Sequence, residues 1–190
     1  MHSPALVRFW EIVFRNEPWA MGFLSIPASK TCHHSGPGGL FVHSIEVAES
    51  VAATLRTYPL LTDIERDAAI TVALLHDAMK VVWSDHNPNR WKVPFRPREH
   101  ERLLPYFLAE PLLDLMQHDQ DAHGVLVRLI DDYTRPHEFA NSPLNSIIRD
   151  ADRLSSHLDA RNSERMTKGN KRNWIKAGGR MHWSPLTPLD

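Results

Sequence analysis

The stretch that most constrains the fold is TDIERDAAITVALLHDAMK, residues 62–80. Thr62 and Glu65, three positions apart, form a capping-box signature, which marks the start of a helix. From Ala68 to Leu75 every residue except Thr71 is apolar, so this part of the helix has little polar surface and must be covered on almost every side. The stretch therefore predicts a domain in which several other elements pack around one central helix.

The rest of the chain supplies those elements as further helices. Apolar residues recur at helical spacing, and no stretch shows the period-two alternation of a half-buried strand. We therefore predict an all-α fold, a helical bundle. The helices are expected at 4–15, 39–57, 98–117 (in two pieces, because Pro105 and Pro111 interrupt it), 122–139 and 142–160, with a proline-rich loop at 84–97. The chain divides into an N-terminal helical extension at 1–30, a main domain at 31–160 and a basic tail at 161–190.

Composition excludes few function classes. The formal net charge is −1, which gives no overall attraction to nucleic acid or membranes. Cys32 is the single cysteine, so no disulfide forms within the chain, and a reducing cytoplasm is the expected location. Arg8 and Glu11 interrupt the apolar residues near the N-terminus, unlike an export signal, and no run approaches the roughly 18–20 apolar residues of a membrane span. Self-association into a homo-oligomer is left open.

Charge is nevertheless uneven along the chain. Between residues 161 and 180, seven basic residues stand against one acid, Glu164. One interpretation is a solvated or disordered end, and the glycines there argue against a long helix. The other is an arm that attracts phosphates, with Trp174 and Trp183 available to stack on bases.

The central helix ends in His76 and Asp77, and this is its most informative feature. An ionised carboxylate in such apolar surroundings needs a partner, because burying an unpaired charge costs several kcal/mol. A metal cation is one such partner, since imidazole and carboxylate suit ions of the Zn, Fe, Ni and Mn type. The chain holds a second His-Asp pair, His118-Asp119, but it lies in the polar run MQHDQDAHG and is expected on a surface loop.

Three more histidines surround a glycine-rich turn in HHSGPGGLFVHSIEVAE, residues 33–49. The turn leads into a helical pattern, so His43 falls near the start of a helix. His33 and His34 precede the turn and have two interpretations. They contact the substrate or support the site, or they form hydrogen bonds at the helix entry.

The order His43, then His76-Asp77, then Asp152 in IIRDADRLSS resembles the H…HD…D pattern of the HD-domain superfamily of metal-dependent phosphohydrolases. The similarity covers roughly residues 30–158. More narrowly, the stretch PASKTCHHSGPGGLFVHSIEVAE is similar to the HD domain of MobH-type, TraI-like conjugative relaxases. Relaxases of that type are longer and carry further domains, so the resemblance concerns the HD region alone.

The resemblance implies a helical HD domain with a metal site in its core. His43, His76, Asp77 and Asp152 would hold one divalent ion, with Asp77 bridging to a second. His100 and His137 lie where many two-metal members add two histidine ligands. The ions would be Mn, Fe, Ni, Zn or Mg.

Each residue also has a simpler interpretation. Asp150 is close enough in sequence to be mistaken for the ligand Asp152. His100 and His137 lie in proline-flanked segments that also suit a surface. Lys80 is expected to contact phosphate and, with Asp77, to act in catalysis, or else to be an ordinary exposed lysine. Arg90 belongs to a loop that binds substrate or is merely solvated.

The expected chemistry is hydrolysis of a phosphate ester by metal-activated water. No glycine-rich phosphate loop followed by Lys-Ser or Lys-Thr is present, which disfavours ATP-dependent transfer. Three hypotheses follow for the role. The chain is a phosphodiesterase or nuclease of single-stranded DNA, as the tail and the relaxase resemblance suggest; a nucleotide phosphomonoesterase; or a non-catalytic, metal-stabilised DNA-binding module.

Overall fold

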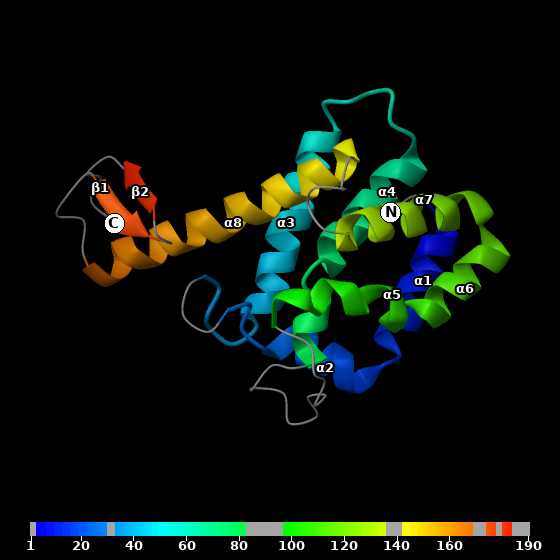
Figure 1. Cartoon of the computed structure of the whole chain (residues 1–190), viewed down its shortest axis with the longest axis horizontal. Helices are drawn as coiled ribbons and strands as arrows, with labels where there is room; N and C mark the ends of the chain where they lie inside the picture. The colour runs from blue at the N-terminus through cyan, green and yellow to red at the C-terminus, as the bar shows by residue number, and fades with distance from the viewer. Residues whose placement is uncertain are drawn as a thin grey trace.

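The computed structural model of the chain describes residues 3–29, 33–82, 97–135, 142–168, 174–177 and 180–183. Helices dominate these residues, which confirms the all-α expectation for the body of the molecule (Figure 1). The elements are α1 (Pro4–Phe14), α2 (Glu17–Ser25), α3 (Gly39–Leu55), α4 (Asp63–Leu75), η1 (Ala78–Val82), η2 (Pro97–Leu103), α5 (Leu104–Phe107), α6 (Ala109–His118), α7 (Gln120–Thr134), α8 (Pro143–Lys168), β1 (Trp174–Ala177) and β2 (Arg180–Trp183).

Helix α4 is the central element, as its sequence predicts. The capping box forms in full: Thr62 accepts from the Glu65 backbone N–H, and the Glu65 carboxylate accepts from that of Thr62. Helices α3, α7 and α8 all pack against α4. Its buried residues are Asp67, Ala68, Ala69, Thr71, Val72, Ala73 and Leu75. The small side chains of alanine allow these neighbours to approach closely, which places the end of α4 deep in the core.

The N-terminal helices share this core. Ser3 and Asn16 cap α1 and α2, and a proline stands in the first turn of each helix. Helix α1 packs on α6, and α2 packs on α3 and η1. Trp19 of α2 stacks on Phe23 and donates its indole N–H to the carbonyl of Ala78, 3.2 Å away. This contact ties the segment that follows the His-Asp pair to the N-terminal helices.

The turn before α3 depends on its glycines. Gly38 adopts a left-handed backbone with φ of +72°, which favours glycine over other residues. A Cβ on Gly39 would lie only 1.9 Å from the carbonyl oxygen of His34. The close approach of these two backbones therefore requires glycine at 39, and it holds His34 against the start of α3.

Two details differ from the sequence expectations. His118 and Asp119 do not lie on a loop: His118 is the last residue of α6, and Asp119 caps α7 by accepting from the Ala122 N–H at 2.9 Å. The tail is not wholly irregular either. Helix α8 continues past residue 160 to Lys168, and β1 and β2 form an antiparallel hairpin whose register pairs Trp174 with Trp183. The hairpin is an addition to the expected all-α fold.

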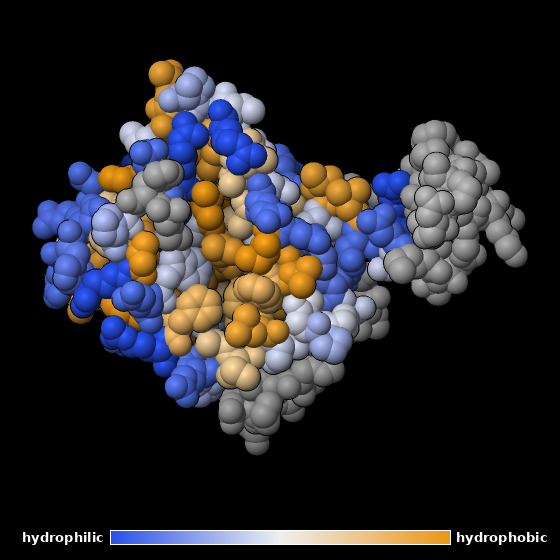
Figure 2. Space-filling model, turned by 180° about the vertical axis from the view of Figure 1, so that it is seen from behind, coloured by the Kyte–Doolittle hydropathy of each residue, from blue (hydrophilic) through white to orange (hydrophobic). Residues whose placement is uncertain are grey.

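The outer surface is mixed in polarity. Figure 2, the view from behind, shows apolar residues gathered near the middle of that face among hydrophilic ones. Exposed large apolar side chains in the described part of the chain include Met21, Leu24 and Val42. None of the helices that the structure describes has the length and hydropathy needed to cross a bilayer.

Candidate metal centre

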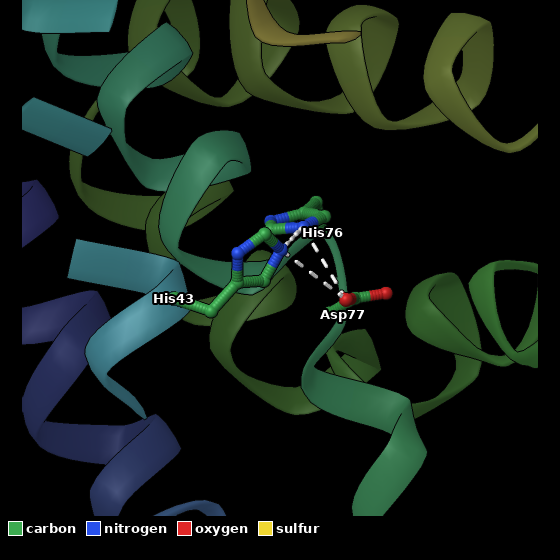
Figure 3. A group of neighbouring side chains, drawn as sticks. All are labelled: His43, His76 and Asp77. Atoms are coloured by element: carbon green, nitrogen blue, oxygen red, sulfur yellow. Dashed lines mark hydrogen bonds and ion pairs between the residues drawn. The ribbon is translucent and has the colours of Figure 1, made fainter. Parts of the chain in front are cut away.

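Three buried side chains meet where α3 passes the end of α4. His43 lies in the second turn of α3, His76 follows the last residue of α4, and Asp77 comes next (Figure 3). The Nε2 atoms of His43 and His76 are 3.3 Å apart. Asp77 Oδ2 lies 3.7 Å from the first of these nitrogens and 3.5 Å from the second. This buried group could hold a metal ion.

Helix α8 brings a second carboxylate to the same place. Asp152 Oδ1 lies 3.1 Å from His43 Nε2 and 3.7 Å from His76 Nε2. Asp150 points elsewhere: its side chain is 66% exposed and pairs with Arg153. Of the two aspartates that the sequence leaves as alternatives, the structure brings Asp152 to the cluster.

The spacing of these four donors fits a single ion. Atoms bound about 2.1 Å from one ion, in a tetrahedral or octahedral array, lie about 3.0–3.4 Å from one another. The two Nε2 atoms lie 3.3 Å apart, and each lies 3.1–3.7 Å from the two carboxylate oxygens, so side-chain shifts of a few tenths of an ångström would bring these pairs to the ideal spacing. The donor set, two imidazole nitrogens and two carboxylates, is also one that divalent transition metals accept.

Hydrogen bonding prepares His76 for this role. Its Nδ1 lies 2.7 Å from the carbonyl oxygen of Ala73, which can only accept, so Nδ1 carries a proton. In the neutral ring, Nε2 then has a free lone pair that points toward the other donors. Outward hydrogen bonds of this kind are typical of histidine ligands, because they fix the ring and its tautomer.

The electrostatics of the cluster call for a positive charge at its centre. Burial favours neutral His76, but Asp77 and Asp152 outweigh it and raise the His76 pKa to about 10. Burial lowers the pKa of His43. Although burial alone would raise the pKa of both carboxyls, Lys80 and His76 lower that of Asp77, and the two imidazoles lower that of Asp152. Without an ion, a proton on His76 supplies the charge.

Asp77 also has a second set of contacts. Its Oδ1 lies 2.7 Å from Nε2 of His100, a buried residue of η2, and its Oδ2 lies 2.5 Å from the Lys80 ammonium. One oxygen thus faces both the four-donor cluster and Lys80, and the other faces His100. Lys80 lies beside the cluster and keeps 24% of its side chain exposed.

Both histidines before the turn lie against His43. The ring of His33 is 5.2 Å from that of His43, and burial, reinforced by His43 and Lys80, lowers the His33 pKa to about 4. His34 is buried, with its Nε2 3.2 Å from a carboxylate oxygen of Glu46. Two more candidate residues, His137 and Arg90, lie outside the described residues.

Two polar residues behind His43 were not expected from the sequence: Ser155 contacts His43, and Glu46 contacts Ser155. The Ser155 hydroxyl lies 3.0 Å from Nδ1 of His43 and donates to Glu46 Oε2 at 2.7 Å. Helical spacing offers a signal for both: Ser155 is three residues after Asp152, and Glu46 is three after His43. Residues three apart share a helix face.

Comparison with known proteins adds one indication. The profile of the TraI_2 family, described as "Putative helicase", matches residues 18–86. This segment spans α2 to η1 and contains His43, His76 and Asp77, but it ends before His100 and Asp152. No curated protein and no solved structure matches the chain. Over about a third of its length, the chain is therefore similar to that family.

Proposed function

We propose that the chain is a metal-dependent phosphohydrolase of the HD type, with His43, His76, Asp77 and Asp152 as ligands of one divalent ion. The observation that carries the proposal is the convergence of residues from α3, the end of α4 and α8: each carboxylate lies 3.1–3.7 Å from the Nε2 atoms of both imidazoles. The buried carboxylate of Asp77 and the partly exposed carboxylate of Asp152 lie beside two imidazoles and leave a negative centre, for which a cation is the natural occupant.

A bound divalent ion would supply a Lewis acid that lowers the pKa of water and polarises phosphoryl oxygens. The described residues also support a place for a second ion, because Asp77 Oδ1 points to His100 rather than to the first cluster. His100 would be a ligand there, together with His137. The Asp77 carboxylate lies between the two proposed metal sites, so it could serve as a ligand to both ions.

The remaining roles follow from charge and exposure. Lys80 is held beside Asp77 and is partly open to solvent, so its ammonium can neutralise a non-bridging phosphate oxygen as negative charge builds up. Asp77 is proposed as both ligand and catalytic residue, since it links the ion, Lys80 and His100. His33 lies close to the cluster and is a candidate for substrate contact, as is Arg90.

The proposed substrate is a phosphodiester of single-stranded DNA. Two observations support a DNA-processing role: the match of residues 18–86 to a family described as "Putative helicase" and the basic tail. In that tail the hairpin pairs Trp174 with Trp183; Lys171 and Arg172 precede the first strand, and Lys176 and Arg180 belong to the two strands. Phosphate attraction combined with aromatic stacking is how many proteins bind single strands without sequence preference.

The test uses the full chain, stripped of metal and reloaded with Mn, Fe, Ni, Zn or Mg. We expect metal-dependent cleavage of a single-stranded oligonucleotide. The variant Asp152→Asn should lower the rate at least about 100-fold, because it removes a ligand charge, whereas Asp150→Asn should stay within about twofold of wild type. Elemental analysis of the untreated protein should find a transition metal.

Other outcomes contradict specific parts of the proposal. Hydrolysis of nucleotides but not of oligonucleotides would replace the substrate assignment with a nucleotide phosphomonoesterase. Metal binding without hydrolysis of either would leave a metal-stabilised binding module. Equal activity of Asp152→Asn and Asp150→Asn would reject the ligand set.

A further inference from the structure

A chain of hydrogen bonds leads away from the cluster behind His43. Ser155 of α8 is buried, and its hydroxyl oxygen lies 3.0 Å from Nδ1 of His43. The same hydroxyl lies 2.7 Å from Oε2 of Glu46, one turn along α3 from His43. His43 is thus held on two sides: Nε2 faces the other donors, and Nδ1 faces Ser155.

The chemistry of these groups fixes the direction of each bond. A serine hydroxyl has one proton to give, and a carboxylate can only accept. Ser155 therefore donates to Glu46 and must accept from His43. This assigns the proton of His43 to Nδ1 and leaves a lone pair on Nε2, the atom that faces His76 and Asp152.

His34 supports this arrangement from the outside. Its Nε2 lies 3.3 Å from the Ser155 hydroxyl and 3.2 Å from Glu46 Oε2, and its backbone N–H donates to Asp159 at 2.7 Å. The turn places it there, since His34 has a positive φ of 43° and contacts Gly39. The His34 ring is hydrogen-bonded to Ser155 and Glu46, behind His43 and away from the cluster. This position argues against the substrate contact, one of the two interpretations that the sequence allowed.

We infer that Ser155 is a positioning residue for His43 and that Glu46 sets the direction of its hydrogen bond. The inference rests on the proposed function, because it concerns a proposed metal ligand. With Ser155 in place, His43 is held in the tautomer that can bind an ion. Without it, the ring can carry its proton on Nε2 instead, where it blocks coordination.

The outer end of this network is accessible from a different side. Glu46 and Ser155 line a cleft of about 320 Å³ between α3 and α8, together with Glu49. Glu49 lies three residues after Glu46 on the same helix and is exposed. It offers a matched control, since its removal changes the charge of the cleft by the same amount as removal of Glu46.

The experiment compares full-length Ser155→Ala, Ser155→Thr, Glu46→Ala and Glu49→Ala. Zn²⁺ affinity is measured by competition with a chromophoric chelator, and histidine tautomers by ¹⁵N NMR of the metal-free protein. Ser155→Ala should weaken Zn²⁺ binding about 10–100-fold, the usual effect of losing a partner of a ligand histidine. Glu46→Ala should weaken it by a smaller factor, whereas Ser155→Thr and Glu49→Ala should stay near wild type.

The NMR spectra separate positioning from mere structural support. His43 should be protonated at Nδ1 in the wild type and in Glu49→Ala, and should lose that preference in Ser155→Ala. Wild-type tautomer and affinity in Ser155→Ala would overturn the inference. A wild type that shows the Nδ1 tautomer but binds no divalent ion would reject the proposed function and leave the tautomer assignment intact. If either Ser155 variant fails to fold, the test uses Glu46→Ala instead. A weaker preference of His43 for the Nδ1 proton in that variant supports the inference, and an unchanged preference overturns it.

Discussion

At the scale of single residues, Asp77 has the contacts that matter most. Four groups approach its carboxylate: His43 at 3.7 Å, His76 at 3.5 Å, Lys80 at 2.5 Å and His100 at 2.7 Å. Because of Lys80 and His76, its pKa is held well below the usual range in spite of burial. Asp77 is therefore an ionised carboxylate in the core, and every group around it has to be understood as a partner of that charge.

This charge distribution predicts how pH affects the metal-free protein. The pKa of His76 rises on folding from 6.5 to about 10, so its stabilising effect is complete below pH 6.5 and is lost as pH rises toward 10. The pKa of Asp77 falls on folding from 3.8, so its contribution is present above that value and is lost in acid. The pKa values of His33 and His43 fall on folding from 6.5, so their contributions are lost as pH drops below 6.5. In the presence of a chelator the protein should therefore melt at its highest temperature near pH 6.5.

Thermal unfolding between pH 4 and 10 in the presence of a chelator checks this prediction. In His76→Ala the decline in melting temperature between pH 7 and 10 should be much smaller. His118→Ala, which removes the exposed histidine of the other His-Asp pair, should keep the wild-type profile. A wild-type profile that is flat up to pH 10 would contradict the charge assignment.

At the scale of elements, the position of the cluster at the end of α4 is favourable. The carboxyl end of a helix carries partial negative charge, which stabilises a cation next to it. His76 and Asp77 directly follow the last residue of α4, while His43 comes from α3 and Asp152 from α8. The orientation of α4 therefore adds to the attraction that the two carboxylates exert on a positive ion.

The start of α3 gives a prediction at this scale. Gly39→Ala should destabilise the fold by more than about 1 kcal/mol, because the new methyl group would lie 1.9 Å from the His34 carbonyl oxygen. The required shift moves His34 and the first turns of α3, so metal affinity should also fall. Chemical denaturation and Zn²⁺ titration measure the two effects.

Gly36→Ala is the matched control for this substitution. Gly36 belongs to the same turn, but a Cβ there would have no atom within 4 Å. Its stability should stay within about 0.5 kcal/mol of wild type. Equal losses in both variants would mean that the close approach at Gly39 has no energetic consequence.

At the scale of the whole molecule, one core connects all the main helices. Residues of α1, α3, α4, α7 and α8 belong to a single cluster of buried apolar side chains. His43, His76 and Asp77 are buried within this core and come from segments that are far apart in sequence. Folding of the body and assembly of the centre are consequently a single event.

The basic tail gives a prediction about salt. Affinity for a single-stranded oligonucleotide should fall as NaCl rises from 50 to 200 mM, with a slope of about −0.7 in log–log terms for each phosphate contact. Replacing Arg172, Lys176 and Arg180 by alanine should make the slope shallower by up to about 2. Fluorescence anisotropy of a labelled oligonucleotide at several salt concentrations measures the slope for both proteins.

Three exposed arginines of the body provide the control, Arg15, Arg56 and Arg128. Replacing them by alanine changes the net charge equally, and the salt slope should change by less than about 0.5. If the two triple variants behave alike, the tail is not the binding element.

The sequence could predict the helices and the burial of His76 and Asp77 at the end of α4 because both follow from local patterns. A buried charge after an apolar helix needs a partner, whatever the fold. The choice between Asp150 and Asp152 was different: these residues point about 200° apart on a helix, and the rotation of α8 against α4 depends on packing. The role of Ser155 could not be predicted either, because it depends on the same rotation of α8.

The hairpin was missed because its strands are only four residues long. WIKA and RMHW are too short for an alternating pattern to stand out. Gly178 and Gly179 between them were interpreted only as helix breakers, although two glycines between short strands are also a typical two-residue hairpin turn. His34 was assigned to substrate because the sequence does not reveal which side of His43 it would occupy.

The length of α8 determines how long a molecule must be to contact both the cluster at Asp152 and the hairpin. From Asp152 to the last residue of the helix, Lys168, the axis rises about 24 Å, and the hairpin packs beside the final turns of α8 (Figure 1). A mononucleotide at the cluster is too small to reach those strands. Only a polymer of several units can occupy both places at once, so tail substitutions should affect long substrates and leave the turnover of monomers unaltered.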